Sequence, residues 1–232
     1  MHHIFSFSDK GPRLENQDSF CAERVGKQIL LGVADGVGGN NGGEIASRFA
    51  IETLISGVTD GLSVSECADM AHEGILQMAL DSIELRGMAT TLTAVACDNY
   101  IVTGVHCGDS RAYILRGNGV KQLTTDHTEA ARLLADGKIT KSEYASYPRK
   151  NVLVSALGTH REFLKETFTF QCQAGDRLLL LSDGIYAEFS KRELQSRSAS
   201  RNDFEQFFEE IIVDMRERGP KDNYTLVGLE FE

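Results

Sequence analysis

Hydrophobic residues recur along the chain with two periods, and these periods predict groups of strands and helices. Short apolar runs, several with every second residue apolar, end at Gly, Asn or Asp and indicate β-strands. The expected strands are 3–7, 28–34, 91–97, 101–107, 112–115, 120–123, 163–170, 177–181 and 224–231. Two pairs of these strands flank short turns at 98–100 and 117–119, so each pair is expected to form an antiparallel hairpin.

Longer segments carry apolar residues at helical spacing. They predict helices over 43–58 and 64–85, the second with Ser63 as its N-cap and Gly87 just past its end. A third helix, with Asn202 or Asp203 near its start, is marked by Phe204, Phe208, Ile211 and Met215. Hairpins dominate and regular strand–helix–strand alternation is absent, so we expect an α+β fold of antiparallel sheets with helices packed outside.

The chain of 232 residues contains three prolines, and no repeat or linker stands out. We therefore expect one domain over 1–232. The segment 128–150 is more polar and charged than its neighbours, which predicts a surface flap within that domain.

Charge and cysteine content narrow the possible partners and compartment. A formal net charge of −10 disfavours nucleic acid. Five cysteines without a Cys-x-x-Cys motif favour reduced thiols in the cytoplasm. Neither a signal peptide nor an apolar run long enough for a membrane span is found, so we expect no membrane partner.

Aspartates at strand ends are the candidate chemical groups. Asp35 and Asp183 follow apolar strands and precede glycine, Asp222 precedes the last strand, and Asp18 and Asp109 lie beside predicted strands. If these ends meet at one sheet edge, the repelling carboxylates need cations, and oxygen ligands suit Mg²⁺ or Mn²⁺. Position alone leaves a metal cluster and ordinary Asp-Gly turns both open.

Two neighbouring features fit such a cluster. Gly36 lets the backbone approach closely, so its carbonyl could be a further metal ligand. Arg13 could grip a phosphate through two parallel hydrogen bonds, although an isolated surface arginine is more often simply solvated. A pair of cations about 3.5–4 Å apart can activate water for attack on phosphorus.

Competing chemistries fail on spacing. No cysteine has an arginine six residues later, as cysteine-based phosphatases need, and Asp-x-Asp is absent. The segment 108–112 lacks the last glycine of a nucleophile elbow, and Glu44 replaces the lysine of a phosphate-binding loop. His106 and His127 are expected to be structural, and no histidine pair has the spacing of a helical zinc site.

Nine ordered motifs between residues 11 and 230 resemble the metal-dependent protein phosphatases of type 2C, the PPM family, in its bacterial form. The motifs are RLENQD (13–18), VADGVGG (33–39), ATT (89–91), GDSRAY (108–113), LTTDH (123–127), NVL (151–153), ALG (156–158), LSDG (181–184) and KDN (221–223). Each motif is weak alone, but the ordered set is specific.

The resemblance implies two stacked antiparallel β-sheets flanked by α-helices and a centre of two Mn²⁺ or Mg²⁺ ions. It implies that Asp35 bridges the metals, that the Gly36 carbonyl binds one, and that Asp183 and Asp222 bind the other. Asp18 would hold metal-bound water, Asp109 would bind a weaker third metal, and Arg13 would bind phosphate. In this reading Arg13, Asp18 and Asp35 are the catalytic residues.

The implied function is hydrolysis of phosphoserine and phosphothreonine in proteins. A metal-bridging hydroxide would attack phosphorus with no covalent enzyme intermediate. The expected partners are phosphoproteins made by a cognate serine/threonine kinase, and a monomer is expected.

The sequence departs from the family pattern at three positions. Gln17 replaces an acidic residue, Val37 replaces the histidine proposed as general acid in animal members, and Tyr147 replaces the histidine of a His-Pro pair. Two alternatives to the enzyme are a pseudophosphatase that binds phosphoproteins and a binding module stabilised by a structural cation. The intact Asp35, Asp183 and Asp222 favour the enzyme.

Overall fold

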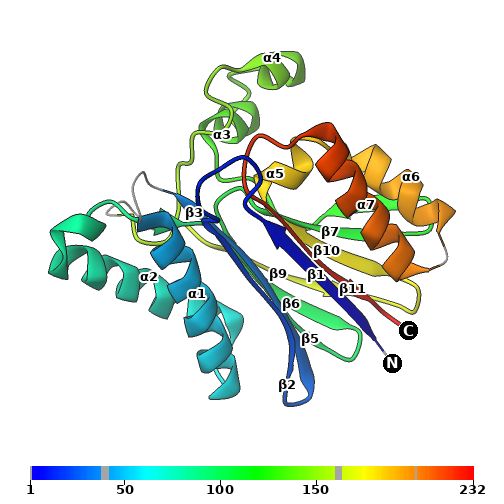
Figure 1. Cartoon of the computed structure of the whole chain (residues 1–232), viewed down its shortest axis with the longest axis horizontal. Helices are drawn as coiled ribbons and strands as arrows, with labels where there is room; N and C mark the ends of the chain where they lie inside the picture. The colour runs from blue at the N-terminus through cyan, green and yellow to red at the C-terminus, as the bar shows by residue number, and fades with distance from the viewer. Residues whose placement is uncertain (1, 38–41, 160–163, 202) are drawn as a thin grey trace.

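Two antiparallel β-sheets lie face to face, and helices cover the outer face of each (Figure 1). The computed structural model describes residues 2–37, 42–159, 164–201 and 203–232. The first sheet has the order β1 (His3–Asp9), β11 (Tyr224–Glu230), β10 (Arg177–Leu181), β7 (Arg111–Arg116) and β8 (Gly119–Gln122). The second has the order β2 (Asp18–Val25), β3 (Gln28–Val37), β5 (Leu92–Asp98), β6 (Ile101–Cys107) and β9 (Glu166–Gln171), with β4 (Ala89–Thr90) paired to β3.

The helices fall into two outer layers and a projecting pair. The second sheet is covered by α1 (Gly42–Thr59) and α2 (Val64–Asp81), followed by the 3₁₀ turn η1 (Ile83–Leu85). The first sheet is covered by α5 (Asp183–Tyr186), α6 (Lys191–Ser200) and α7 (Phe204–Arg218). The remaining helices, α3 (Glu129–Ala135) and α4 (Lys141–Ser146), project from the top in Figure 1. The predicted fold class is confirmed.

The central strands contain long apolar runs, Ile29–Ala34 in β3 and Leu178–Leu181 in β10, because both of their faces are buried. In β3, Leu31 and Val33 point into the core between the sheets, whereas Leu30 and Ala34 point toward α1 and α2. Successive residues of a strand face opposite sides, so one unbroken apolar run serves two cores. In β10, Leu178 and Leu180 likewise face the other sheet, and Leu179 and Leu181 face α7.

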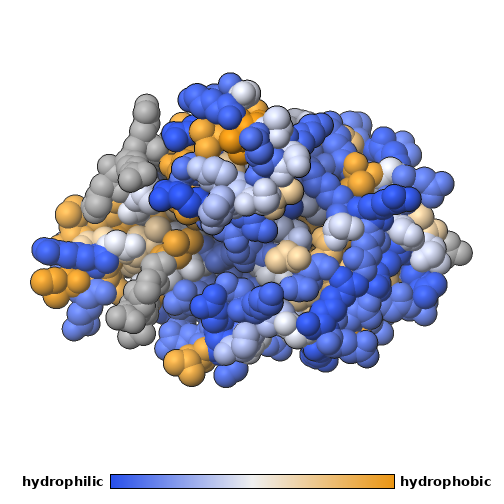
Figure 2. Space-filling model, turned by 90° about the horizontal axis from the view of Figure 1, so that it is seen from above, coloured by the Kyte–Doolittle hydropathy of each residue, from blue (hydrophilic) through white to orange (hydrophobic). Residues whose placement is uncertain are grey.

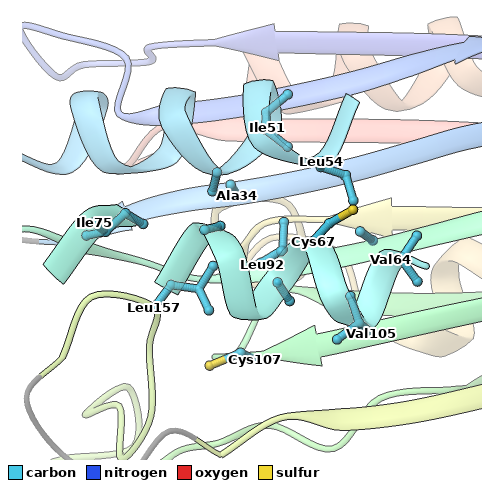
Figure 3. Close-up of a cluster of buried hydrophobic side chains, with 14 of the residues drawn as sticks. Ala34, Ile51, Leu54, Val64, Cys67, Ile75, Leu92, Val105, Cys107 and Leu157 are labelled. Carbon is cyan, nitrogen blue, oxygen red and sulfur yellow. The ribbon is translucent and has the colours of Figure 1, made fainter. Parts of the chain in front are cut away.

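Figure 3 shows the core between α1, α2 and the second sheet. Ile51 and Leu54 from α1 and Val64 and Cys67 from α2 pack with strand side chains such as Leu92. Burying a side chain of this size contributes about 1.5–3 kcal/mol. This layer therefore fixes β3, whose end carries Asp35.

Helix ends agree with the predictions at some points and not at others. Ser63 and Glu66 form a reciprocal capping box at the start of α2, and the Asp203 side chain caps α7. The predicted end of the second helix at residue 85 is wrong. The helix ends at Asp81 because Ser82 is extended, and Ile83 is 74% exposed instead of continuing the buried stripe.

Several elements were not predicted. Strand β2 was missed, and α6 was missed because Leu194 is its only buried residue. Asp35 was expected just after its strand but lies inside β3. The proposed start of a strand at residue 163 and the Asn202 cap lie outside the described residues, as do residues 38 and 39 of the VADGVGG motif.

The predicted flap holds α3 and α4, which begin at the N-caps Thr128 and Thr140. The segment is closed at its base because Thr128 pairs with Leu153, and the Val154 N–H donates to the His127 carbonyl over 2.8 Å. Whether 128–150 acts as a flap, and whether 1–232 is one domain, remain predictions. Within the described part of the chain, no helix is long and apolar enough to cross a membrane.

Candidate metal and phosphate site

Five aspartates from both sheets gather at one edge of the sandwich. Asp18 begins β2 and Asp35 lies near the end of β3, where the two residues are direct cross-strand partners. Asp183 and Asp222 follow β10 and precede β11, which are neighbours in the other sheet. Asp109 lies between β6 and β7, where the chain crosses from one sheet to the other. The strand ends therefore meet at one edge of the sandwich, as expected.

An open cleft of about 1230 Å³ lies over this edge. Its lining includes Arg13 and four of the aspartates, namely Asp35, Asp109, Asp183 and Asp222. Figure 2 looks down on this side of the molecule and shows a hollow near its centre, surrounded mainly by hydrophilic side chains.

The aspartates lie close enough together to disturb one another's ionisation. Burial raises the pKa of Asp35 well above its usual range, and Asp18, Asp183, Asp109 and Asp222 raise it further. Burial raises the pKa of Asp183 to about 6, with a further contribution from Asp222. Like charges without a counter-ion disfavour ionisation. This edge therefore requires protons or cations at neutral pH.

One oxygen of the Asp18 carboxylate also lacks a hydrogen-bond partner. Burial raises the pKa of Asp18 to about 6, while hydrogen bonds from Ser182 and Thr225 act to lower it. Both hydroxyls donate to Oδ2, each over 2.7 Å. Oδ1 is the one buried side-chain oxygen or nitrogen in the described residues that lacks a hydrogen-bond partner. An orphaned carboxylate oxygen beside other carboxylates fits a cation or its bound water.

Asp222 forms an ion pair with Arg13. Arg13 Nη2 donates to Asp222 Oδ2 over 2.7 Å, and both side chains are exposed. Across 2–37, 42–159, 164–201 and 203–232, no three acidic, histidine or cysteine side chains are already grouped to hold a metal ion. The donor chemistry nevertheless fits hard cations, because the cluster consists of carboxylates, because the pKa values of Asp18 and Asp35 are raised, and because one Asp18 oxygen is unpartnered. A cation here would replace the guanidinium as the counter-charge of Asp222.

The glycines after Asp35 and Asp183 are needed for close packing. A Cβ at Gly36 would lie 2.3 Å from the carbonyl oxygen of Gly43 at the start of α1. A Cβ at Gly184 would lie 2.1 Å from the carbonyl oxygen of Asn223. The backbone approach expected at Gly36 is present, and a metal-binding role for its carbonyl remains a prediction.

Asp109 accepts a hydrogen bond from Tyr186, and the ring of Tyr186 lies against Arg111. The Tyr186 hydroxyl donates to Asp109 Oδ2 over 3.2 Å. The Arg111 guanidinium lies 3.6 Å from the centre of the Tyr186 ring and donates to both carboxylate oxygens of Asp126. Burial raises the pKa of Asp109 to about 7, and the charges of Asp183 and Asp126 add to this. Sequence reasoning missed Tyr186, since nothing in its local pattern marks a contact with Asp109.

Asn223 was quoted in a motif without a role, and the structure gives it one. Its side chain accepts from the Gln17 N–H over 2.9 Å and donates to the carbonyls of Lys10 and Glu15 over 2.8 and 2.9 Å. These bonds hold the loop that presents Arg13 next to Asp222. No local pattern in the sequence indicates these contacts, because they join residues far apart in the chain.

The two histidines examined in the sequence are structural, as expected. His106 is fully buried, with Nδ1 2.8 Å from the Thr93 hydroxyl and Nε2 3.0 Å from the Thr125 carbonyl. His127 Nδ1 accepts from the Gly108 N–H over 3.3 Å. Neither ring lines the cleft.

Known proteins match this fold and sequence along nearly the whole chain. The profile of the family described as protein phosphatase 2C matches residues 11–226. The serine/threonine phosphatase Stp of Listeria welshimeri is 30% identical over 232 residues, covering 96% of this chain and 89% of that protein. The structure of the S. agalactiae serine/threonine phosphatase superimposes with a TM-score of 0.90 at 28% identity, covering 100% of both chains.

A third match includes metal. The structure of the catalytic domain of the serine/threonine protein phosphatase PstP in complex with 2 manganese ions has a TM-score of 0.85 and 28% identity, covering 99% of this chain and 97% of that one. The fold and the aspartate edge thus define a metal-dependent protein phosphatase. The chain belongs to the protein phosphatase 2C family.

Proposed function

We propose that the chain removes phosphate from phosphoserine and phosphothreonine in proteins, using two Mn²⁺ or Mg²⁺ ions held at the aspartate edge. The observation that carries the proposal is the meeting of five aspartates from both sheets with Arg13 at one open cleft. The relatives named serine/threonine phosphatases support the same substrate class.

Each residue has a proposed task. Asp35, at the centre of the cluster, and the Gly36 carbonyl would contact the cations, with Asp183 and Asp222 as ligands on the side of the other sheet. Asp18 would accept a hydrogen bond from water at the metal, and Asp109 would bind a third, weaker cation. When bound, the cations supply an activated water and neutralise charge on the phosphoryl oxygens.

Arg13 is the proposed phosphate ligand. Its guanidinium now donates to Asp222, and a cation on Asp222 would free this fork for two phosphoryl oxygens. Two parallel charged hydrogen bonds would both bind the phosphate and orient it for in-line attack. Val37 has no proton to donate, so protonation of the leaving group falls to water or another group in the cleft.

Substrate choice is proposed to reside in the flap. The segment from Thr128 to Arg149 borders the cleft through Arg149, whose side chain is 64% exposed. Exchanging this segment should change peptide preference and leave hydrolysis of a small aryl phosphate intact. Equal loss on both substrates would count against the flap as a selector.

We also propose a setting for the enzyme. It would act as a cytoplasmic monomer on proteins phosphorylated by a cognate serine/threonine kinase. All five cysteines are free and buried, which suits a reducing compartment. A mass measured by light scattering above that of one 25.5 kDa chain would contradict the monomer.

The test of the function is phosphate release from an aryl phosphate and from a phosphothreonine peptide, with Mn²⁺ added and then chelated. We expect release from both substrates with Mn²⁺ and none after chelation. Binding of Mn²⁺ without release from either substrate would instead support a pseudophosphatase.

A further inference from the structure

The carboxylate of Asp18, which has one oxygen without a hydrogen-bond partner, lies at the end of a chain of hydrogen-bonded hydroxyl groups. Asp18 is 6% exposed, and Ser182 and Thr225, which donate to its Oδ2, are fully buried. The Thr225 hydroxyl also lies 2.8 Å from the Ser8 hydroxyl, which accepts from Asn16 Nδ2 over 2.8 Å. The chain therefore runs from the loop that carries Arg13 to the aspartate edge.

The proton positions in this chain follow from the number of hydrogens available. A hydroxyl has one hydrogen, and Thr225 gives its hydrogen to Asp18, so Ser8 must donate to Thr225. Ser8 in turn receives its hydrogen bond from the amide of Asn16. The Ser182 hydroxyl gives its hydrogen to Asp18 and accepts from the Thr225 N–H over 3.0 Å. The hydrogen bonds of the chain thus all run in one direction and end at Asp18 Oδ2, which accepts from Ser182 and Thr225.

This arrangement fixes the orientation of the Asp18 carboxylate and leaves one of its oxygens free. Two hydrogen bonds converge on Oδ2, and Oδ1 has no partner. Rotating the carboxylate would break both bonds in a buried site where no solvent replaces them, which is costly. The backbone N–H of Asp18 is held too, because it donates to Asn16 Oδ1 over 3.2 Å.

We propose that Thr225 and Ser182 are positioning residues that fix Asp18 with Oδ1 available to the metal centre. The inference rests on the proposed function, because it assumes that cations bind at this edge. It goes further by assigning the metal affinity in part to two buried hydroxyls that would touch neither metal nor substrate. Mutating partners of this kind, which orient the groups of a metal site, typically lowers metal affinity by about 10–100-fold.

The variant that tests the proposal is Thr225→Val, which keeps the shape of the side chain and removes its hydroxyl. We expect Mn²⁺ binding, measured by calorimetry at constant pH, to weaken about 10-fold. The KM for an aryl phosphate at saturating Mn²⁺ should stay near that of the unchanged protein, because Arg13 holds the phosphate. Thr225→Ser restores a hydroxyl and should restore most of the affinity.

Thr93→Val is the matched control. Thr93 is a fully buried threonine of the other sheet, and its hydroxyl bonds to His106 and to the Ser110 carbonyl but to no aspartate. It should lower thermal stability without changing Mn²⁺ affinity. If Thr225→Val does not fold, Ser8→Ala removes the next donor and should weaken Mn²⁺ binding by a smaller factor.

The outcomes separate this inference from the proposed function. If the unchanged protein binds no Mn²⁺, the metal site of the proposed function fails. If it binds Mn²⁺ and Thr225→Val, or Ser8→Ala in its place, binds equally well, the positioning role is wrong. It is also wrong if Thr225→Ser is as weak as Thr225→Val, or if Thr93→Val weakens binding to the same extent.

Discussion

The two walls of the cleft are built in opposite ways. The aspartate wall consists of strand ends with fully buried neighbouring residues, such as Ala34 before Asp35 and Ser182 before Asp183. In the flap wall, Ala130 is the only buried residue of α3 and α4. The flap is held instead by polar contacts, including Arg149 to Glu129 over 2.8 Å and Tyr147 to Glu129 over 2.9 Å.

This difference places the proposed catalytic groups on the rigid wall and the proposed choice of substrate on the flap. Charged groups that must keep fixed positions are attached to the most tightly packed strands, because a dense core resists displacement. A segment held by exposed polar contacts contributes little to global stability. It can therefore change in sequence without disturbing the aspartates.

The largest expected effect is at the aspartate wall. Asp183→Asn should lower turnover of both an aryl phosphate and a phosphopeptide by about 100-fold or more, because one carboxylate ligand is lost. The metal-free variant should melt no lower than the unchanged protein, since it removes a charge from a repelling cluster. Full activity of this variant in the presence of Mn²⁺ would refute the ligand assignment.

Arg13 lies on the same wall and should give the next largest effect. Arg13→Gln should lower kcat/KM for an aryl phosphate by about 10- to 100-fold, the loss expected for charged hydrogen bonds. Arg149→Gln, at the flap, is the control and should leave this value unchanged. A similar loss in both variants would remove the distinction between the two walls.

The pH dependence of metal binding sharpens the contrast further. Folded Asp18 and Asp183 have pKa values of about 6, above the usual value of 3.8. Their contribution to the stability of the metal-free protein is present below about pH 4 and is lost as pH rises through 6. Bound Mn²⁺ compensates the charges that appear, so the gain in melting temperature on adding Mn²⁺ should be larger at pH 7.5 than at pH 5.5. Equal gains at the two pH values would contradict a carboxylate site.

The smallest effect is expected within the flap. Glu129→Gln weakens the contacts with Arg149 and Tyr147, which are partly exposed. The melting temperature and the rate with an aryl phosphate should hardly change, while the rate with a phosphopeptide shifts. A large drop in melting temperature would show that the flap is part of the core after all.

The sequence predicted the apolar strands and the aspartates beside them because both leave strong local patterns. The runs in β3 and β10 are apolar at every position, and Asp35 and Asp183 directly precede glycine. The long helices α1 and α7 were found for the same reason. Where one face of an element is buried, its spacing records the fold.

What the sequence did not predict depends on contacts between distant segments. Strand β2 is mixed in polarity, so its pairing that sets Asp18 opposite Asp35 left no clear period. Tyr186 and Asn223 act through hydrogen bonds to Asp109 and to the Arg13 loop, which no local pattern encodes. Helix α6 buries only Leu194 and so has no apolar stripe.

The most direct test of the account is the anomalous scattering of manganese in crystals grown with Mn²⁺. We predict two strong peaks at the aspartate edge, within coordination distance of Asp35, Asp183 and Asp222, with the Arg13 guanidinium moved off Asp222. Peaks elsewhere, or none at this edge while Arg13 stays paired with Asp222, would contradict the claim that these five aspartates form the metal site.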